Sequence, residues 1–93
     1  MKDVRLDRTL LAAIRKLAAT ERRELGEAIA AAQAAFGSPH VHLGAGVRKL
    51  KGRWYEMRAG LDRRIVFREC DGSLSFEFMG HHDAVQRFLK GLK

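Results

Sequence analysis

With 93 residues, the chain has room for a single domain with one modest hydrophobic core, which excludes an architecture with a separate cofactor domain. Hydrophobic residues make up 46% of the sequence and proline occurs once, so a folded domain is expected rather than disorder. The 18 Lys and Arg residues outnumber the 11 Asp and Glu residues, and the net charge of +7 would attract a polyanion or an acidic protein.

The N-terminal third predicts a strand followed by two antiparallel helices. Residues 2–6 favour a short strand, and apolar residues at helical spacing then predict an amphipathic helix over about residues 7–18. A second helix is expected from Thr20, which can cap it, to Gly37, with Pro39 behind as a further stop. Much of its apolar face is alanine, so we expect it to pack closely on its neighbours.

The rest of the chain predicts a meander of three strands and a short terminal helix. After a loop over residues 40–46, strand-like runs cover residues 54–58, 64–69 and 74–79, and Asp71-Gly72 is a strong hairpin signal. A final helix is expected over about residues 83–92. The predicted fold is α+β, in one domain over residues 1–93: a short N-terminal strand, a two-helix hairpin, an antiparallel three-stranded meander with about four strands in one sheet, and a short C-terminal helix.

Side-chain alternation along these strands predicts two chemically different sheet faces. The face toward the helices would carry Tyr55, Met57, Ile65, Phe67, Leu74, Phe76 and Phe78. The opposite face would carry Trp54, Glu56, Arg58, Arg64, Val66 and Arg68. With the helices on one face only, we expect this second face to be free to bind a ligand, while Trp54 covers an edge of the core rather than stacking on a base.

Cations, a carboxylate and imidazoles are expected to converge on that second face. Lys49, Lys51 and Arg53 precede its first strand, and His81-His82 follows its last. RNA cleavage without metal needs a base for the 2′-hydroxyl, cations for the phosphorane and an acid for the departing 5′-oxygen, and this set offers each type of group. The alternative is a solvated face whose arginines pair across strands with Glu56 and Glu69.

The other titratable residues predict neither a metal site nor a disulfide. The histidine pairs His40/His42 and His81/His82 lack accompanying thiolates and helical metal-ligand spacing, so no metal is expected. Cys70 has no partner cysteine and is expected to fill space in or beside a strand. The N-terminus lacks the apolar core of a signal peptide, and no stretch approaches the ~20 apolar residues of a membrane helix. We therefore expect a cytoplasmic protein.

Four motifs follow one another along the second half of the chain: Arg48-Lys49-Leu50-Lys51-Gly52, Trp54-Tyr55-Glu56-Met57-Arg58, Arg64-Ile65-Val66-Phe67 and Gly80-His81-His82-Asp83. Their order resembles that of the RelE/ParE superfamily of bacterial toxins, and with the leading strand and two helices the resemblance covers nearly the whole chain. It implies a toxin of a type II toxin–antitoxin module, neutralised by a cognate antitoxin. Many members cleave mRNA on the ribosome, whereas the ParE branch poisons DNA gyrase.

The resemblance also implies roles for individual residues. Arg64 would contact the scissile phosphate, with Arg58 as a second clamp. His81 or His82 would serve as general acid or base, with Glu56 as a competing base unless it only holds an arginine. Lys49 and Lys51 resemble the family's phosphate-binding lysines, and the charge pattern adds Arg53 and Arg68 as further residues expected to bind phosphate. The tyrosine that follows the last strand in some members is missing from residues 82–86.

We therefore expect an endoribonuclease without metal or cofactor that leaves 2′,3′-cyclic phosphate and 5′-hydroxyl ends. Its partners would be the antitoxin, mRNA and the ribosome, with no membrane and with DNA contacted only through the antitoxin complex. Two alternatives remain: a ParE-like inhibitor of DNA gyrase, and a non-catalytic module of the toxin fold that binds an antitoxin or DNA.

Overall fold

The computed structural model describes residues 2–37 and 46–92, which form an α+β fold. In chain order its elements are β1 (Asp3–Leu6), α1 (Arg8–Arg15), α2 (Ala19–Gly37), β2 (Arg48–Lys51), β3 (Trp54–Arg58), β4 (Arg64–Cys70), β5 (Ser73–Gly80) and α3 (His82–Lys90). The predicted fold class is confirmed. His40 and His42, and the loop predicted around them, lie outside the described residues except for Gly46.

The sheet has five strands in the order β1-β5-β4-β3-β2, with β1 parallel to β5 and the other pairs antiparallel. This is one strand more than the approximate four expected. The extra strand is β2, which pairs with β3 through the two-residue turn Gly52-Arg53, where Gly52 has a φ of 56°. The hairpin predicted at Asp71-Gly72 is confirmed, and Gly72 has the positive φ of 74° that such a turn favours.

The two N-terminal helices begin in different ways. The Asp7 carboxylate caps α1 by accepting hydrogen bonds from the backbone N–H groups of Thr9 at 3.0 Å and Leu10 at 3.2 Å. The prediction that Thr20 caps α2 is wrong, because the helix begins one residue earlier, at Ala19. Glu21 in the first turn instead accepts a 3.0 Å hydrogen bond from the N–H of Ala18.

The main core lies between the sheet and the pair α1–α2. The helices contribute Leu10, Leu25, Ala28 and Ala32, and the strands contribute Met57, Ile65, Phe67, Leu74 and Phe76. As predicted, the alanine face of α2 is buried, since Ala32 is 0% exposed and Ala35 is 1% exposed. Phe67 is the aromatic centre of this core, with its ring centroid 4.9 Å from that of Phe76.

The prediction that Phe78 shares this face with Phe76 is wrong. Val66 pairs with Phe78 and Phe67 pairs with Phe76, so Glu77 is an extra residue in β5. Because one extra residue reverses the alternation, Phe78 points to the opposite face and stacks on Phe88 of α3 at 4.7 Å.

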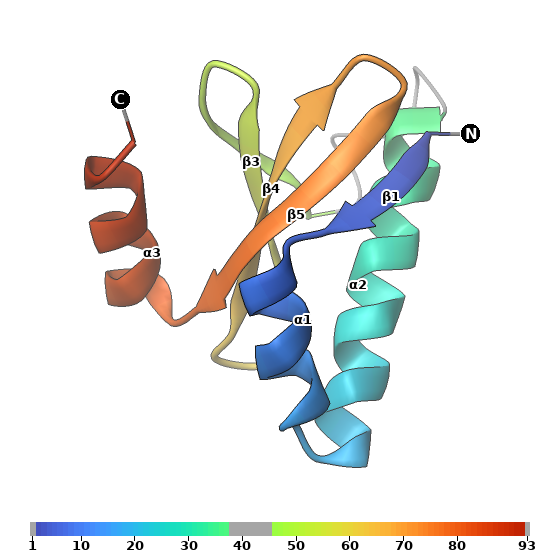
Figure 1. Cartoon of the computed structure of the whole chain (residues 1–93), viewed down its shortest axis with the longest axis vertical. Coiled ribbons are helices and arrows are strands. Elements are labelled where there is room, and N and C mark those ends of the chain that lie inside the picture. Colours follow the sequence, from blue (N-terminus) through green and yellow to red (C-terminus); the bar gives the residue numbers. More distant parts are fainter. Residues whose placement is uncertain (1, 38–45, 93) are drawn as a thin grey trace.

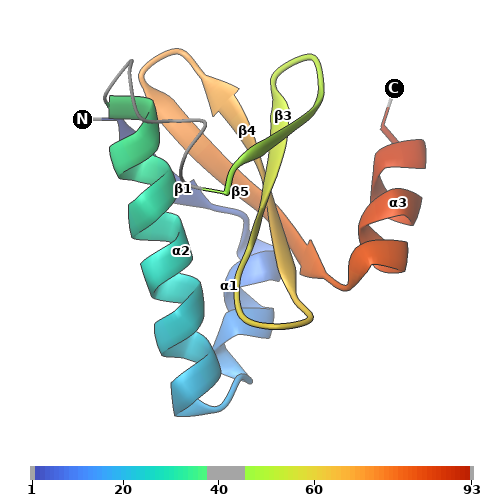
Figure 2. The same ribbon diagram turned by 180° about the vertical axis from the view of Figure 1, so that it is seen from behind.

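Helix α3 therefore does not join the other two helices. It contacts β4 and β5, and Figures 1 and 2 show the sheet between the pair α1–α2 and α3. Its Phe88 ring also packs edge-on against Trp54 at 5.6 Å, and Val66 and Val85 are fully buried on this side. We call Trp54, Val66, Phe78, Val85 and Phe88 the α3 cluster. The second face of the sheet is thus partly covered, contrary to prediction, and Trp54 packs as expected.

Candidate functional site

The uncovered part of the second face carries the predicted polar residues of β3 and β4. Across this strand pair Arg58 lies opposite Arg64, Glu56 opposite Val66, and Trp54 opposite Arg68. Directly paired residues of antiparallel strands point to the same side, so the predicted grouping of these six side chains on one face is confirmed. Trp54 and Val66 belong to the α3 cluster, so we call the remaining surface of Glu56, Arg58, Arg64 and Arg68, with Arg48 of β2 at its edge, the basic face.

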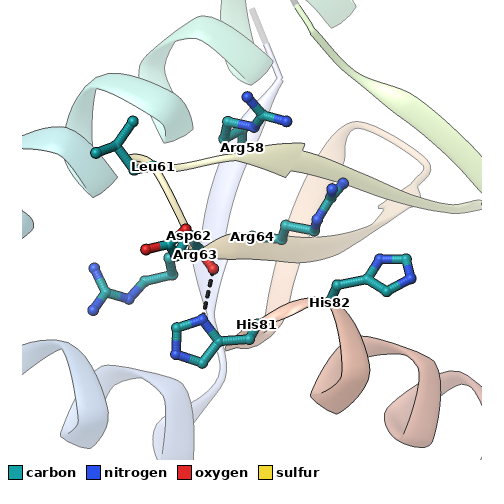
Figure 3. Close-up of a pocket in the computed structure, with 7 residues that line it drawn as sticks. All are labelled: Arg58, Leu61, Asp62, Arg63, Arg64, His81 and His82. Atoms are coloured by element: carbon teal, nitrogen blue, oxygen red, sulfur yellow. Dashed lines mark hydrogen bonds between the residues drawn. The ribbon is translucent and has the colours of Figure 1, made fainter.

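One pocket gathers four of the predicted site residues at the end of the basic face next to α3. It has a volume of about 310 Å³ and is lined by Arg58, Leu61, Asp62, Arg63, Arg64, His81 and His82. Figure 3 shows the arginines at positions 58 and 64 extending to the same side of their strands. Strand β3 ends here, β4 begins here and α3 starts here, so three elements bring these side chains together.

The two histidines of this pocket have different surroundings. Nδ1 of His81 lies 2.7 Å from the carbonyl oxygen of Asp62, and Figure 3 shows its ring turned toward the β3–β4 loop. His81 also lines a neighbouring pocket formed with Glu21 and Glu24, which His82 does not reach. His81 therefore lines both of these pockets, whereas His82 lines only the one that Arg58 and Arg64 also line.

Glu56 lies at the centre of an ion-pair network. Its Oε2 accepts a 2.7 Å hydrogen bond from Nη1 of Arg64 and lies 3.2 Å from Nε of Arg48. The side chain is only 1% exposed, and among residues 2–37 and 46–92 its Oε1 has no hydrogen-bond partner. An unpaired buried polar atom costs about 1–3 kcal/mol, so this carboxylate is retained at a cost to stability.

A second pocket on the basic face surrounds this network. It has a volume of about 320 Å³ and is lined by Gly46, Arg48, Glu56, Met57, Arg58 and Arg64. We call this second pocket the arginine pocket, and the first one, which contains His81 and His82, the histidine pocket. Arg58 and Arg64 line both pockets. The two pockets are therefore adjacent, with the pair Arg58/Arg64 as their common wall.

The other predicted phosphate-binding residues lie away from this wall. Lys49 pairs with Tyr55, a residue of the helix-covered face, so Lys49 points away from the basic face. Lys51 pairs with Trp54, and Arg68 lies over the Trp54 ring at 5.7 Å, four residues or ~13 Å along β4 from Arg64. Arg53, in the β2–β3 turn, pairs with exposed Asp71 at 3.2 Å.

The predicted alternative of cross-strand pairing holds for Glu56 and Arg64 but not for Glu69. The Glu69 carboxylate instead lies 3.7 Å from the ammonium group of Lys2. Arg68 is exposed beside Trp54, and Arg58 has no ion pair within the described ranges. Part of the positive charge on the basic face is thus left for a ligand.

Arg63 anchors the loop between β3 and β4, and sequence reasoning did not single it out. It donates a 3.0 Å hydrogen bond to Oε2 of Glu21. The Ala18 N–H and the Arg63 guanidinium both hold the pKa of the Glu21 carboxyl below its ordinary value. Gly60 in this loop has a φ of 98°, and a Cβ added there would lie 3.0 Å from a carboxylate oxygen of Glu24. The loop is thus packed against the start of α2.

Sequence reasoning also missed Arg48. The residue was visible in the first motif, but its contact with Glu56 depends on Leu50 being an extra residue in β2, since Lys49 pairs with Tyr55 and Lys51 with Trp54. In the part of the chain that the structure describes, no three His, Cys, Asp or Glu side chains lie close enough to hold a metal ion. Over the same residues, no helix has the length and apolar character needed to cross a membrane.

No protein-family model matches the chain, and a search of curated proteins found no match. Solved structures do match its fold. The isolated E. coli RelE toxin superposes with a TM-score of 0.66, covering 95% of this chain and 99% of that chain at 22% sequence identity. The intact E. coli RelBE toxin–antitoxin complex gives a TM-score of 0.67, covering 87% of this chain and 96% of that chain at 21% identity.

An archaeal structure agrees with these two. The RelB–RelE antitoxin–toxin complex from Methanococcus jannaschii gives a TM-score of 0.64, covering 90% of this chain and 96% of that chain at 17% identity. The chain therefore has the fold of the RelE toxins over nearly its whole length. The resemblance to the RelE/ParE superfamily seen in the sequence is confirmed at the level of the fold.

Proposed function

We propose that this chain is the toxin of a type II toxin–antitoxin module and that it cleaves mRNA on the ribosome, in the cytoplasm, as a metal-independent endoribonuclease. The observation that carries this proposal is the histidine pocket, where Arg58, Arg64 and His82 meet on the open sheet face of a RelE fold. Guanidinium groups suit the charge of a phosphodiester, and imidazole suits proton transfer near neutral pH.

In the proposed reaction the 2′-oxygen of a ribose attacks the adjacent phosphorus, and the bond from phosphorus to the 5′-oxygen of the next nucleotide breaks. Arg64 and Arg58 stabilise the negative charge that builds up on the phosphorane oxygens. His82 transfers the protons: one leaves the 2′-hydroxyl and one reaches the departing 5′-oxygen. The products are a 2′,3′-cyclic phosphate and a 5′-hydroxyl end.

The geometry favours His82 over the two other candidates for proton transfer. His81 is held by the Asp62 carbonyl at 2.7 Å, which turns its ring toward the loop. Glu56 is 1% exposed and its free oxygen is recessed, so a 2′-hydroxyl has little access to it. We assign Glu56 the task of positioning arginines. Lys51 and Arg68 would contact phosphates farther along the strand, and Arg53 beyond them.

We propose a cognate antitoxin as the protein partner. Solved RelE structures from E. coli and M. jannaschii contain the antitoxin RelB, and this chain shares their fold. The net charge of +7 and the open arginines of the basic face favour an acidic segment that covers them. DNA would be contacted only through that complex.

The test is induced expression of the wild type, His82→Ala, His81→Ala and Arg64→Ala, with growth recorded and mRNA 5′-ends mapped in the same cultures. The proposal expects growth arrest with new 5′-hydroxyl ends at codon-defined positions, lost in the His82 and Arg64 variants and retained with His81→Ala. Arrest with intact mRNA would overturn the ribonuclease and favour gyrase inhibition. No arrest at all would favour a module that only binds.

A further inference from the structure

The two arginines that share Glu56 approach it through different nitrogens. Arg48 meets Oε2 through Nε and Arg64 meets it through Nη1. Within the described residues, no carboxylate other than Glu56 pairs with either guanidinium group. The Arg48 side chain is 60% exposed, and its inner nitrogen, Nε, lies 3.2 Å from Glu56.

This arrangement preorganises a phosphate site. An arginine held at Nε presents its two Nη atoms as a fork, which matches two oxygens of a phosphate group. Three guanidinium groups and one carboxylate line the arginine pocket, which leaves an excess of two positive charges there. Because Glu56 is buried, it fixes the arginines without offering an exposed negative charge that would repel a phosphate.

The arginine pocket also lies where the substrate would continue. It shares the wall Arg58/Arg64 with the histidine pocket, in which we place the cleaved bond. A single strand that lies across this wall brings a neighbouring phosphate toward β2, the edge strand that carries Arg48.

We propose that Arg48 is a substrate-binding residue: held by the same Glu56 oxygen that aligns Arg64 at the cleaved phosphate, it clamps the phosphodiester next to the cleaved bond of single-stranded RNA. That the ligand is RNA rests on the proposed function. It also replaces Lys49, which the family resemblance suggested, with its neighbour Arg48 as the phosphate contact. Glu56 is a positioning residue of the clamp.

The chain supplies a matched control for this proposal. Arg48 and Lys49 are adjacent, exposed and equally charged, but Arg48 pairs with Glu56 whereas Lys49 pairs with Tyr55 and points to the other face. Removing either one lowers the net charge by the same amount. Only the loss of Arg48 removes a side chain from the arginine pocket.

The experiment measures binding of a 2′-O-methyl oligoribonucleotide, which cannot be cleaved, to full-length wild type, Arg48→Ala and Lys49→Ala over a range of salt concentrations. Arg48→Ala should weaken binding about 10-fold or more and reduce the slope of log K against log salt by about 0.7, the value for one phosphate contact on a single strand. Lys49→Ala should stay within about twofold of wild type with its slope unchanged.

A third variant, Arg48→Lys, keeps the positive charge but removes the paired guanidinium nitrogens, so it tests the two contributions separately. It should keep the wild-type salt slope and lose severalfold in affinity, since an ammonium group cannot bind two oxygens side by side. Equal losses of affinity in Arg48→Ala and Lys49→Ala would overturn the proposal, because they would attribute binding to general electrostatic attraction. An Arg48→Ala variant that binds as tightly as wild type would also overturn it. Because no cleavage is needed, these outcomes are read independently of whether the wild type cuts mRNA.

Discussion

The guanidinium of Arg63 donates a 3.0 Å hydrogen bond to the carboxylate of Glu21, and this contact joins the β3–β4 loop to the first turn of α2. The same loop supplies the Asp62 carbonyl that meets His81, and its residues line the histidine pocket. One wall of the proposed active site is therefore positioned from the opposite side of the sheet, by the helix that builds the main core.

This contact predicts a pH dependence of stability. The pKa of Glu21 is lowered by the Ala18 N–H and by Arg63, so folding favours the ionised carboxylate. Its contribution to stability is present above the ordinary carboxyl pKa of ~4.3 and is lost as the pH falls through the lowered value. Glu21→Gln should therefore lose less stability than wild type between about pH 5 and pH 3, measured by denaturant unfolding.

The control for this experiment is Glu27→Gln, an exposed carboxylate on the same helix. It should follow the wild-type curve across this range. If the unfolding free energies of Glu21→Gln and the wild type changed with pH in parallel, Glu21 would be equally easy to protonate in the folded and unfolded chain. The contact with Arg63 would then not stabilise the ionised carboxylate.

If Glu56 only positions arginines, its replacement should lower the rate of cleavage without changing how that rate depends on pH. Glu56→Gln should lower kcat roughly 10-fold or more, because a neutral amide aligns Arg64 and Arg48 less well than a carboxylate. The pH profile of kcat/KM should keep its wild-type shape, since we propose that His82, and not Glu56, transfers the protons. A profile that loses its acidic limb in Glu56→Gln, while His82→Ala retains it, would make Glu56 the base after all.

The α3 cluster predicts a large effect from one aromatic residue. Phe88 stacks on Phe78 at 4.7 Å and meets Trp54 at 5.6 Å, so Phe88→Ala should cost about 2–4 kcal/mol of unfolding free energy. Trp54, the only tryptophan in the sequence, reports the change directly through its fluorescence. Leu61→Ala, at a residue 90% exposed, should stay within about 0.5 kcal/mol of wild type. Equal stabilities would mean that α3 is not held by these rings.

The cap of α1 predicts a smaller effect. Asp7 accepts from two backbone N–H groups, so Asp7→Ala should cost about 1 kcal/mol, measured by thermal or denaturant unfolding. Asp7→Asn keeps an oxygen acceptor and should recover most of this loss. An Asp7→Asn variant as unstable as Asp7→Ala would attribute the effect to charge rather than to the capping hydrogen bonds.

Local patterns in the sequence predict every element of the fold except β2. Helical spacing of apolar residues located α1 and α2, and the Asp71-Gly72 pair located the β4–β5 hairpin, because both signals arise within a few neighbouring residues. The position of α3 could not be predicted in this way. It depends on the extra residue Glu77, which turns Phe78 toward the far face, and extra residues are defined only by pairing with another strand.

The candidate site shows the same division. Alternation within β3 and β4 correctly grouped Arg58 with Arg64, since neither strand has an extra residue between them and the turn. Strand β2 does have an extra residue, Leu50. As a result Arg48, and not Lys49 as the family resemblance suggested, lies on the same face as Glu56. The difference between the two histidines depends on the hydrogen bond that the Asp62 carbonyl oxygen accepts from His81, a contact between residues 19 positions apart.

The extra residue in β5 also determines where this hairpin can lose a residue without disturbing the pairing of its strands. Strand β5 has one residue to spare over the span where it pairs with β4, so deletion of Glu77 alone would leave a regular ladder with Phe76 and Phe78 on their present faces. Strand β4 has none to spare, and loss of Val66 would shift each later side chain of that strand to the opposite face. The two strands of this hairpin thus differ in tolerance: β5 accepts the loss of one residue, whereas the same loss in β4 would exchange side chains between the core and the basic face.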